Sequence, residues 1–583
     1  STSMFRNETA SNNTAVGFGS LYNTTTGAQN TAIGTDALTT STTAGSNTAV
    51  GHDALGDTTT GGQNNAFGDG AMDKNTIGYR NVAMGSSAMF KNTEGFCNTA
   101  LGHIAMYCNV TGDLVTAVGA SALYKNTADK NTAVGSCAGY NNTSGVNFVA
   151  IGHNSGHCNT TADGNTFVGA SSGFKTETGA SNTSVGANSL MCNVSSANNT
   201  AVGSDSLRKN TGADNTAVGV SSLACNTSGT SNVALGSQAG KNTTTGTCNI
   251  AIGTDVRRDG KTGSNNVAIG FQALRESEEA SDNTAVGHAS LQQNTTGNFN
   301  VAVGNSAMLD NTTGTQNVAV GTSALSNNTE GTCNTALGHS TMENTTTGDC
   351  NTAVGRTALL ALTTGVRNTA VGKGALCDIT TTQDNTAIGY DSAKDSTANY
   401  TTAIGTEAVF RATGSGNTGV GYRTLFLNTS GTHNSTLGYQ SMCKNTTGAN
   451  NVAIGCRALF ENTTGTENVS VGTNSLLNNQ TGNSNTSLGY NSLCVNTASN
   501  NTTVGASSLC ANTSGESNSA IGRNSLRSNT SGDENTAIGR NALCANTTSN
   551  GNVAVGVCAL LKNTDGGNNV AVGRNSLLCN VSG

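Results

Sequence analysis

Apolar and polar residues follow a pattern that repeats about every 17 residues along this chain. The phrase Asn-Thr-Ala-Val-Gly, or a variant with Ile, Leu, Phe or Met before the glycine, recurs from Gly17 to Gly573. Of the 33 steps between successive glycines of this phrase, 28 are 17 residues long and five are 16 residues long. Internal repetition of this kind is typical of architectures in which each repeat packs on its neighbours. The spacing predicts 34 stacked coils.

The segment from Asn300 to Gln316 shows the parts of one coil clearly. Its opening pentad, Asn300–Gly304, is rich in Val and reads as a short β-strand. Ala307–Leu309 is a second short apolar run, and Asp310–Gln316 is a polar turn. Because Asn, Thr, Gly and Val are poor helix formers, a helical fold is excluded. We predict an all-β fold, a parallel β-solenoid or β-roll, with two short strands and two turns in each coil.

Positions of constant residue type indicate a role for each part of the coil. Counted from the repeat glycine, Val303 lies at position −1 and Met308 at position +4. We expect these two positions to fill the interior, and the Ala at −2 to face outward and pack on another chain. The Asn at −4 is expected to form an axial ladder of side-chain hydrogen bonds. The repeat glycines permit corner conformations that a side chain would obstruct. They include Gly17, Gly34, Gly51, Gly270, Gly304 and Gly573.

The five short steps show where the coil tolerates a deletion. Asn126–Lys130 is one residue shorter than the corresponding Asn311–Gln316, so the missing residue lies in the polar turn. A turn at the surface accepts such a loss. A one-residue slip within a strand would instead move its side chains to the opposite face.

Composition and charge narrow the classes of function. Pro and Trp are absent, aromatic residues are 4% of the chain and charged residues 10%. The net charge is −7 and the 27 Lys and Arg are dispersed, which argues against nucleic-acid binding. No stretch approaches the roughly 20 apolar residues of a membrane helix, so we expect no membrane insertion.

Residues 1–583 are predicted to form one continuous repeat array. Ser1–Phe5 already follow the phase of a coil, and Gly583 falls in a turn. Isolated solenoids need capping repeats, and neither end carries one. We therefore expect the chain to be a segment of a longer array.

The recurring Asn-Thr-Ala-Val-Gly and Asn-Val-Ala-Ile-Gly phrases, the latter at Asn266–Gly270, resemble the head repeats of trimeric autotransporter adhesins. The resemblance covers nearly the whole chain and implies a homotrimeric β-roll that binds host matrix. Those heads use a shorter coil. The longer coil with Asn-Thr-Thr-Gly is more similar to fibre proteins of giant viruses, phages and algae. No stalk, neck or membrane anchor is recognisable, so that family's mode of secretion is not carried over.

A search for catalytic and metal-binding patterns predicts no enzyme, no metal and no cofactor. Five histidines lie at position +1 and are expected to be exposed corner residues: His52, His103, His153, His288 and His339. The most charged turns, Arg257–Arg258 and Arg275–Glu279, are expected to be solvated, or to mark a receptor-binding cluster.

Two further patterns predict covalent modification. Cys333 and Cys350, and likewise Cys494 and Cys510, share a position in adjacent coils, which favours either axial disulfides or free thiols that pack as small apolar groups. Sequons recur in turns that we expect to be exposed, although Asn, Thr and Gly are also good turn residues. The candidate glycosylation sites are Asn226, Asn242, Asn294, Asn311, Asn428, Asn445, Asn462, Asn512, Asn529 and Asn546.

These observations favour a non-catalytic structural fibre at a cell or virion surface, or otherwise extracellular, acting as a spacer or adhesive rod. Its main partner would be itself, as a homotrimer or through lateral or end-to-end assembly. One alternative is an adhesin head that binds a host receptor or surface glycan through repeated weak contacts. Another is an ice-binding solenoid, although Val82, Val233 and Val267 interrupt the Thr row at position −3.

Overall fold

The computed structural model describes Met4 and residues 6–582, so four of the five residues of Ser1–Phe5, and also Gly583, lie outside the described part. The chain forms two compact units, Ser1–Thr296 and Gly297–Gly583. Each unit is a parallel β-solenoid, and no helix occurs among the described residues. The predicted fold class is confirmed. A single uninterrupted array over residues 1–583 stays a prediction.

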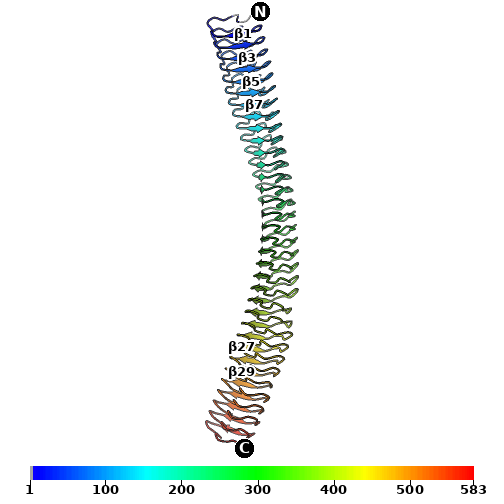
Figure 1. Ribbon diagram of the computed structural model, residues 1–583, viewed down its shortest axis with the longest axis vertical. Coiled ribbons are helices and arrows are strands. Elements are labelled where there is room, and N and C mark those ends of the chain that lie inside the picture. The colour runs from blue at the N-terminus through cyan, green and yellow to red at the C-terminus, as the bar shows by residue number, and fades with distance from the viewer. Residues whose placement is uncertain (1–3, 5, 583) are drawn as a thin grey trace. The chain divides into compact units, whose positions relative to one another are not determined.

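The first unit contains the three-residue strands β1–β17, one in each coil (Figure 1). These strands are β1 Thr14–Val16, β2 Thr31–Ile33, β3 Thr48–Val50, β4 Asn65–Phe67, β5 Val82–Met84, β6 Thr99–Leu101, β7 Thr116–Val118, β8 Thr132–Val134, β9 Val149–Ile151, β10 Thr166–Val168, β11 Thr183–Val185, β12 Thr200–Val202, β13 Thr216–Val218, β14 Val233–Leu235, β15 Ile250–Ile252, β16 Val267–Ile269 and β17 Thr284–Val286.

The second unit contains strands β18–β34, of the same length and again one in each coil. These strands are β18 Val301–Val303, β19 Val318–Val320, β20 Thr335–Leu337, β21 Thr352–Val354, β22 Thr369–Val371, β23 Thr386–Ile388, β24 Thr402–Ile404, β25 Thr418–Val420, β26 Ser435–Leu437, β27 Val452–Ile454, β28 Val469–Val471, β29 Thr486–Leu488, β30 Thr502–Val504, β31 Ser519–Ile521, β32 Thr536–Ile538, β33 Val553–Val555 and β34 Val570–Val572.

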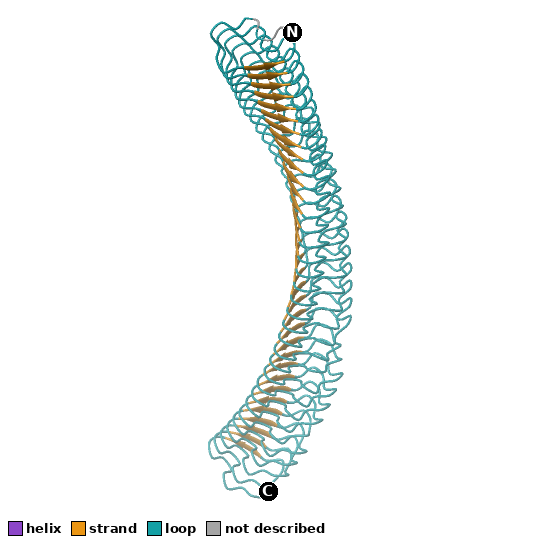
Figure 2. Ribbon diagram, turned by 45° about the horizontal axis from the view of Figure 1, so that its top comes forward, coloured by secondary structure: helices purple, strands orange, loops and turns teal. Residues whose placement is uncertain are grey.

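Within each unit, every strand pairs in parallel with the strand of the next coil, and equivalent residues lie side by side. In the second unit, for example, Ala302 pairs with Ala319 and Val303 with Val320. Within each unit the strands therefore stack as a column, and loops complete each coil (Figure 2). The short steps keep this register: Thr116 pairs with Thr132, sixteen residues later. The prediction that the deletion falls outside the strand is confirmed.

The second predicted strand of the coil is wrong, because Ala307–Leu309 belongs to a turn. Ser306, Met308 and Gln316 have φ angles of 53°, 49° and 59°, in the left-handed region. The same three positions are left-handed in most coils. An extended strand cannot pass through such a residue. The chain therefore turns at these points, and each coil is closed by bends rather than by a second strand.

The predicted orientation of the strand is also wrong. Ala302 is fully buried, whereas Val303, which we expected inside, lies partly exposed on the outer side. Ala307 and Met308 are fully buried and lie in the interior with Ala302, so the expectation for position +4 is confirmed. Because successive residues of a strand point to opposite faces, Ala inside places both of its neighbours outside.

Two large aromatic side chains enter the interior where the usual large residue is missing. Phe148 and Phe167 are fully buried and meet edge to face, with ring centroids 5.9 Å apart. In the same two coils Gly156 and Gly173 replace the usual Leu or Met. A Cβ atom at Gly156 would lie 2.5 Å from Phe148 Cζ, and one at Gly173 would lie 2.6 Å from Phe167 Cδ1. The phenyl rings therefore occupy the space of the missing side chains, as close packing requires.

The repeat glycine is required by a close approach between coils. Gly304 has a φ of 139°, and a Cβ atom there would lie 2.4 Å from the carbonyl oxygen of Gly321 in the next coil. Any side chain would collide with that main chain and would also strain the backbone. This explains why the glycine recurs at the same position.

We predict that Ala302→Leu destabilises the second unit, because it adds volume to a filled interior, at a cost of about 1–3 kcal/mol. Hydrogen–deuterium exchange of the peptides around Val301–Val320 measures the effect, and we expect faster exchange there. The matched control is Val303→Leu, one residue further along, since Leu occurs naturally at position −1 in five other strands. Equal effects of the two substitutions would contradict the inward orientation of Ala302.

Candidate functional site

The outward side of the strands is the most regular surface of the described residues. It consists of positions −3 and −1 of each strand, and we call these two rows the outer face. Position −1 is Val, Ile, Leu, Met or Phe in all 34 strands, and position −3 is Thr in 20 of them. Met84, Leu337 and Ile269 at position −1 keep 50%, 46% and 37% of their surface exposed.

Single exposed apolar residues are normal on soluble proteins, but large contiguous patches mark interaction surfaces. Here the side chains at position −1 form a row along each unit with one member per strand, at a spacing of about 4.8 Å. The row is apolar in every coil although water reaches it. The outer face is therefore the first candidate for a functional surface.

The interior carries polar side chains in two ladders, the first at position −4. Asn317 donates from Nδ2 to the carbonyl oxygen of Gly331 (2.7 Å), near the end of the same coil. Its Oδ1 accepts the main-chain N–H of Asn334 (2.9 Å), which opens the next coil. One buried amide thus forms hydrogen bonds with the main chain of its own coil and with the main chain of the following coil.

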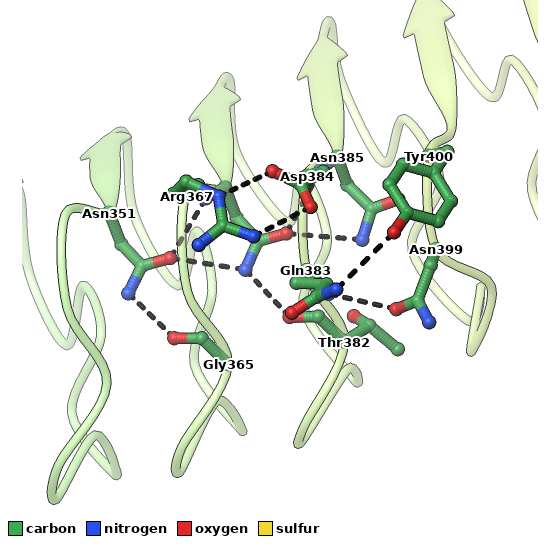
Figure 3. A network of polar contacts seen from close by, with 10 residues as sticks. Asn351, Gly365, Arg367, Thr382, Gln383, Asp384, Asn385, Asn399 and Tyr400 are labelled. Carbon is green, nitrogen blue, oxygen red and sulfur yellow. Dashed lines mark hydrogen bonds and ion pairs between the residues drawn. The ribbon is translucent and has the colours of Figure 1, made fainter.

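The predicted axial ladder is confirmed, and Figure 3 shows part of it in the second unit. Asn368 donates from Nδ2 to Oδ1 of Asn351 (3.1 Å), and Asn385 donates in the same way to Asn368 (3.1 Å). Beside the ladder, Arg367 and Asp384 form an exposed ion pair between adjacent coils, with Nε and Oδ1 2.6 Å apart. Exposed pairs of this kind contribute little to stability.

The second ladder lies at position +7 and was not predicted. Asn328 donates from Nδ2 to Oδ1 of Asn311 (2.7 Å) and to the carbonyl oxygen of Gly331 (3.1 Å). Gly331 therefore accepts hydrogen bonds from both ladders. The sequence signal was the constant Asn before the Thr of each turn, which we interpreted as turn chemistry and as sequons.

This ladder contradicts the expected exposure of the sequons. Nine of the ten candidate asparagines are fully buried: Asn226, Asn294, Asn311, Asn428, Asn445, Asn462, Asn512, Asn529 and Asn546. Their amide groups lie inside the coil, and a glycan on Nδ2 would have to pass through the packed wall. Asn242 is different because it is partly exposed, at position +6, where its Nδ2 donates to Oδ1 of Asp259 (2.9 Å). Asn242 is the one candidate whose amide the fold leaves near the surface.

The four candidate disulfide cysteines are free thiols, and neither pair lies at disulfide distance. Cys333 and Cys350 are exposed, and Cys333 Sγ donates to Oε1 of Gln316 (3.3 Å). Cys494 and Cys510 are half-buried and stacked one coil apart, and Cys494 donates a hydrogen bond to Cys510. That bond lowers the pKa of Cys510 to about 6 and raises the pKa of Cys494. The axial disulfides are therefore not formed in this structure.

The charged turns contain one residue that sequence analysis misplaced. Arg257 is 1% exposed and occupies position +4, where Leu or Met usually lies. Its guanidinium donates to Oγ1 of Thr243 (3.0 Å) and to the carbonyl oxygen of Gly263 (2.5 Å), and Nε has no partner. Burial lowers the pKa of Arg257 to about 10. Because Thr243 and Gly260 interrupt the second ladder here, the guanidinium takes over the bond that Asn would make to the turn carbonyl.

Of the other charged residues in these turns, Glu278 and Glu279 are exposed as expected, whereas Arg258 and Arg275 keep only 26% and 25% of their side-chain surface exposed. Lys261 and Glu278, both about half exposed, pair across adjacent coils at 2.8 Å. The five histidines at position +1 are exposed as predicted.

An aromatic stack in the first unit was missed in the sequence. Six rings at position +5 of successive coils lie nearly parallel, with neighbouring centroids 5.0 to 5.4 Å apart. They belong to Phe90, Tyr107, Tyr124, Tyr140, His157 and Phe174. Their common position in six consecutive coils was the available signal. Stacked aromatic pairs add modestly to the cohesion between coils.

No segment of the described residues forms a helix that could cross a membrane. No protein-family model matches the chain, and no curated protein is significantly similar to it. The repeated parallel β-solenoid is thus established by the structure alone. The relationship to adhesin heads or viral fibres stays a prediction.

We predict that a glycosylating eukaryotic host leaves Asn311 and the eight other buried sequons unmodified in the folded protein, and modifies Asn242 more readily. Peptide mass spectrometry after enzymatic deglycosylation in heavy-oxygen water measures occupancy at each site. Asn242→Gln is the control that should remove the signal. Glycans on Asn311 in material with an intact β-sheet spectrum would contradict the buried ladder.

We predict that Cys510 alkylates faster than Cys494 at pH 7, because a pH above its pKa leaves Cys510 largely as thiolate. The alkylation rate of Cys510, followed by peptide mass spectrometry from pH 5 to 9, should rise through about pH 6. Cys494→Ala removes the donor and should move this midpoint to higher pH. Cys544→Ala, at the same position two coils later, should not. A midpoint unaffected by Cys494→Ala would refute the hydrogen bond as the cause.

Proposed function

We propose that this protein is a non-catalytic structural fibre that assembles with copies of itself through the outer face, as a spacer or adhesive rod outside the cell or on a virion. The observation that carries the proposal is the row at position −1, which is apolar in all 34 strands and yet reached by water. Folding of the single chain does not account for this row, because the interior is filled by Ala, Leu, Met and Asn.

The repeat spacing supports a second copy of this chain as the partner. The apolar side chains recur once per coil, and only a surface with the same axial spacing can match them over many coils. A second copy of this chain has that spacing, whereas a globular partner would cover a few coils and leave the rest in water. Each coil adds a small contact, and these contacts add up along the row.

A homotrimer satisfies this requirement if three outer faces point toward a common axis. This differs from the contact predicted from the sequence, which used the Ala row at position −2. Since that row is buried within each chain, it is not available to a neighbour. We therefore propose that the contact between chains is made by the Val, Ile and Leu side chains on the opposite side of the same strands.

A second candidate is ice binding, and the orientation of position −3 favours it. The Thr side chains at this position, in 20 of 34 strands, point outward beside the apolar row on the same face. Regular outward rows of Thr and apolar methyl groups offer an ordered surface to water. The Val and Ile residues that interrupt the Thr row count against this candidate.

Sedimentation equilibrium of the purified chain tests the assembly. We expect a trimer that dissociates when Val303, Val320 and Leu337 are all changed to Lys, because three adjacent charges cannot be buried at the contact. Thr313→Lys, Glu330→Lys and Thr347→Lys, at exposed turn positions of three adjacent coils, form the matched control and should leave the mass unchanged.

Circular dichroism separates loss of assembly from loss of fold in both triple variants. A monomeric wild-type chain at high micromolar concentration would overturn the self-assembly proposal. If that monomer also showed thermal hysteresis, abolished by the outer-face substitutions, the ice-binding candidate would replace it.

A further inference from the structure

One cluster of metal-ligating side chains lies in the first unit, away from the outer face. Asp36 and Asp53 occupy position +2 of adjacent coils, and His52 occupies position +1 of the second of these coils. One ligand atom of each of the three residues lies within 4.8 Å of the ligand atoms of the other two. Metal–ligand bonds of about 2.0–2.2 Å place the ligands of one tetrahedral ion about 3.3–3.6 Å apart, so small side-chain rotations bring these three groups to coordination distance.

A fourth donor faces the same imidazole from the next coil. His52 Nδ1 lies 3.0 Å from Oδ1 of Asp69 and 3.3 Å from Oδ2 of Asp53. The side chains of His52, Asp53 and Asp69 are 56%, 41% and 68% exposed, so an ion can reach them from water.

The charge around His52 is not compensated by the protein. Among the described residues, no Lys or Arg lies within ion-pair distance of Asp36, Asp53 or Asp69. The nearby Lys74 is engaged by Asp57 and Asp73, each at 2.9 Å. The three carboxylates therefore lie close together without a Lys or Arg partner. A divalent cation would relieve this repulsion.

The surface at the cluster is hollow on both sides of Asp36. A cavity of about 240 Å³ is lined by Asp36, Asp53 and Asp73 among others, and a second of about 320 Å³ is lined by Asp36, Phe18 and Tyr22 among others. Gly19 opens this space in the preceding coil: a Cβ atom there would lie 2.0 Å from Oδ1 of Asp36. Water or a further ligand can therefore reach an ion held at Asp36.

We propose that Asp36, His52 and Asp53 bind one divalent transition-metal ion of the zinc type, with Asp69 as an additional or orienting ligand. The imidazole favours such an ion over calcium or magnesium, which prefer sites made of oxygen ligands alone. The ion links adjacent coils of the first unit and keeps at least one coordination position open to the cavities. The site does not depend on assembly through the outer face.

The test uses the untagged, chelator-treated full chain. Isothermal titration with zinc chloride should show one ion per chain, and cobalt chloride should give visible absorption bands of a site with nitrogen and oxygen ligands. His52→Ala and Asp36→Asn should each weaken zinc binding at least tenfold. His103→Ala, an exposed histidine at the same position of a coil that lacks the carboxylates, should leave binding unchanged.

Two results would overturn the site. One is absence of zinc-dependent heat and of cobalt absorption in the wild-type chain. The other is zinc binding that His52→Ala and Asp36→Asn leave intact, which would place the ion elsewhere, for example on the free cysteines. Circular dichroism of each variant excludes unfolding as the cause of a loss.

Discussion

Most coils of this solenoid depend on buried amide groups that bond the end of one coil to the start of the next. Asn317 shows the arrangement: its Nδ2 binds the carbonyl oxygen of Gly331 in its own coil, and its Oδ1 binds the main-chain N–H of Asn334. These main-chain groups are buried and have no strand partner, and leaving one unpaired costs about 1–3 kcal/mol. Together with the pairing of the strands, this bond holds successive coils in one register. A deletion is tolerated only in the exposed turn, where no ladder amide has to be matched.

The same constraint explains how the interior accommodates exceptions. Where Gly156 and Gly173 remove the usual large side chain, Phe148 and Phe167 fill the space. Where the second ladder is interrupted, Arg257 supplies a donor to the turn carbonyl of Gly263 at the cost of burying its charge. In both cases another residue of the same coil restores either the volume or the hydrogen bond, and the register of the strands is kept.

The outer surface is under no such constraint, and its regularity therefore needs another cause. The ladders require nothing of position −1, and a polar residue there would leave the interior unchanged. The apolar residue is nevertheless present in every strand, and this is the observation on which the proposal of self-assembly rests. The cluster at Asp36, His52 and Asp53 is a local feature instead: it interrupts the repeat in a few coils, as a binding site on a structural rod would.

The period, the parallel strand in each coil, the place of the deletions and the ladder at position −4 could all be read from the sequence, because they depend on spacing alone. The sequence did not show which side of the strand faces inward. Ala302 and Val303 are both apolar, and their alternation therefore does not distinguish the two faces. The structure places Ala inside because Met308 and the amide ladders already fill a narrow coil. The structure likewise places Asn311 in the buried second ladder, where the sequence had predicted an exposed sequon. The cluster of Asp36, His52 and Asp53 also escaped detection, since Asp36 and His52 lie 16 residues apart in the chain and only the coil brings them together. The sequence by itself determined the repeat, and the tertiary structure decided which surface of each repeat is interior, because that choice depends on volume shared between positions.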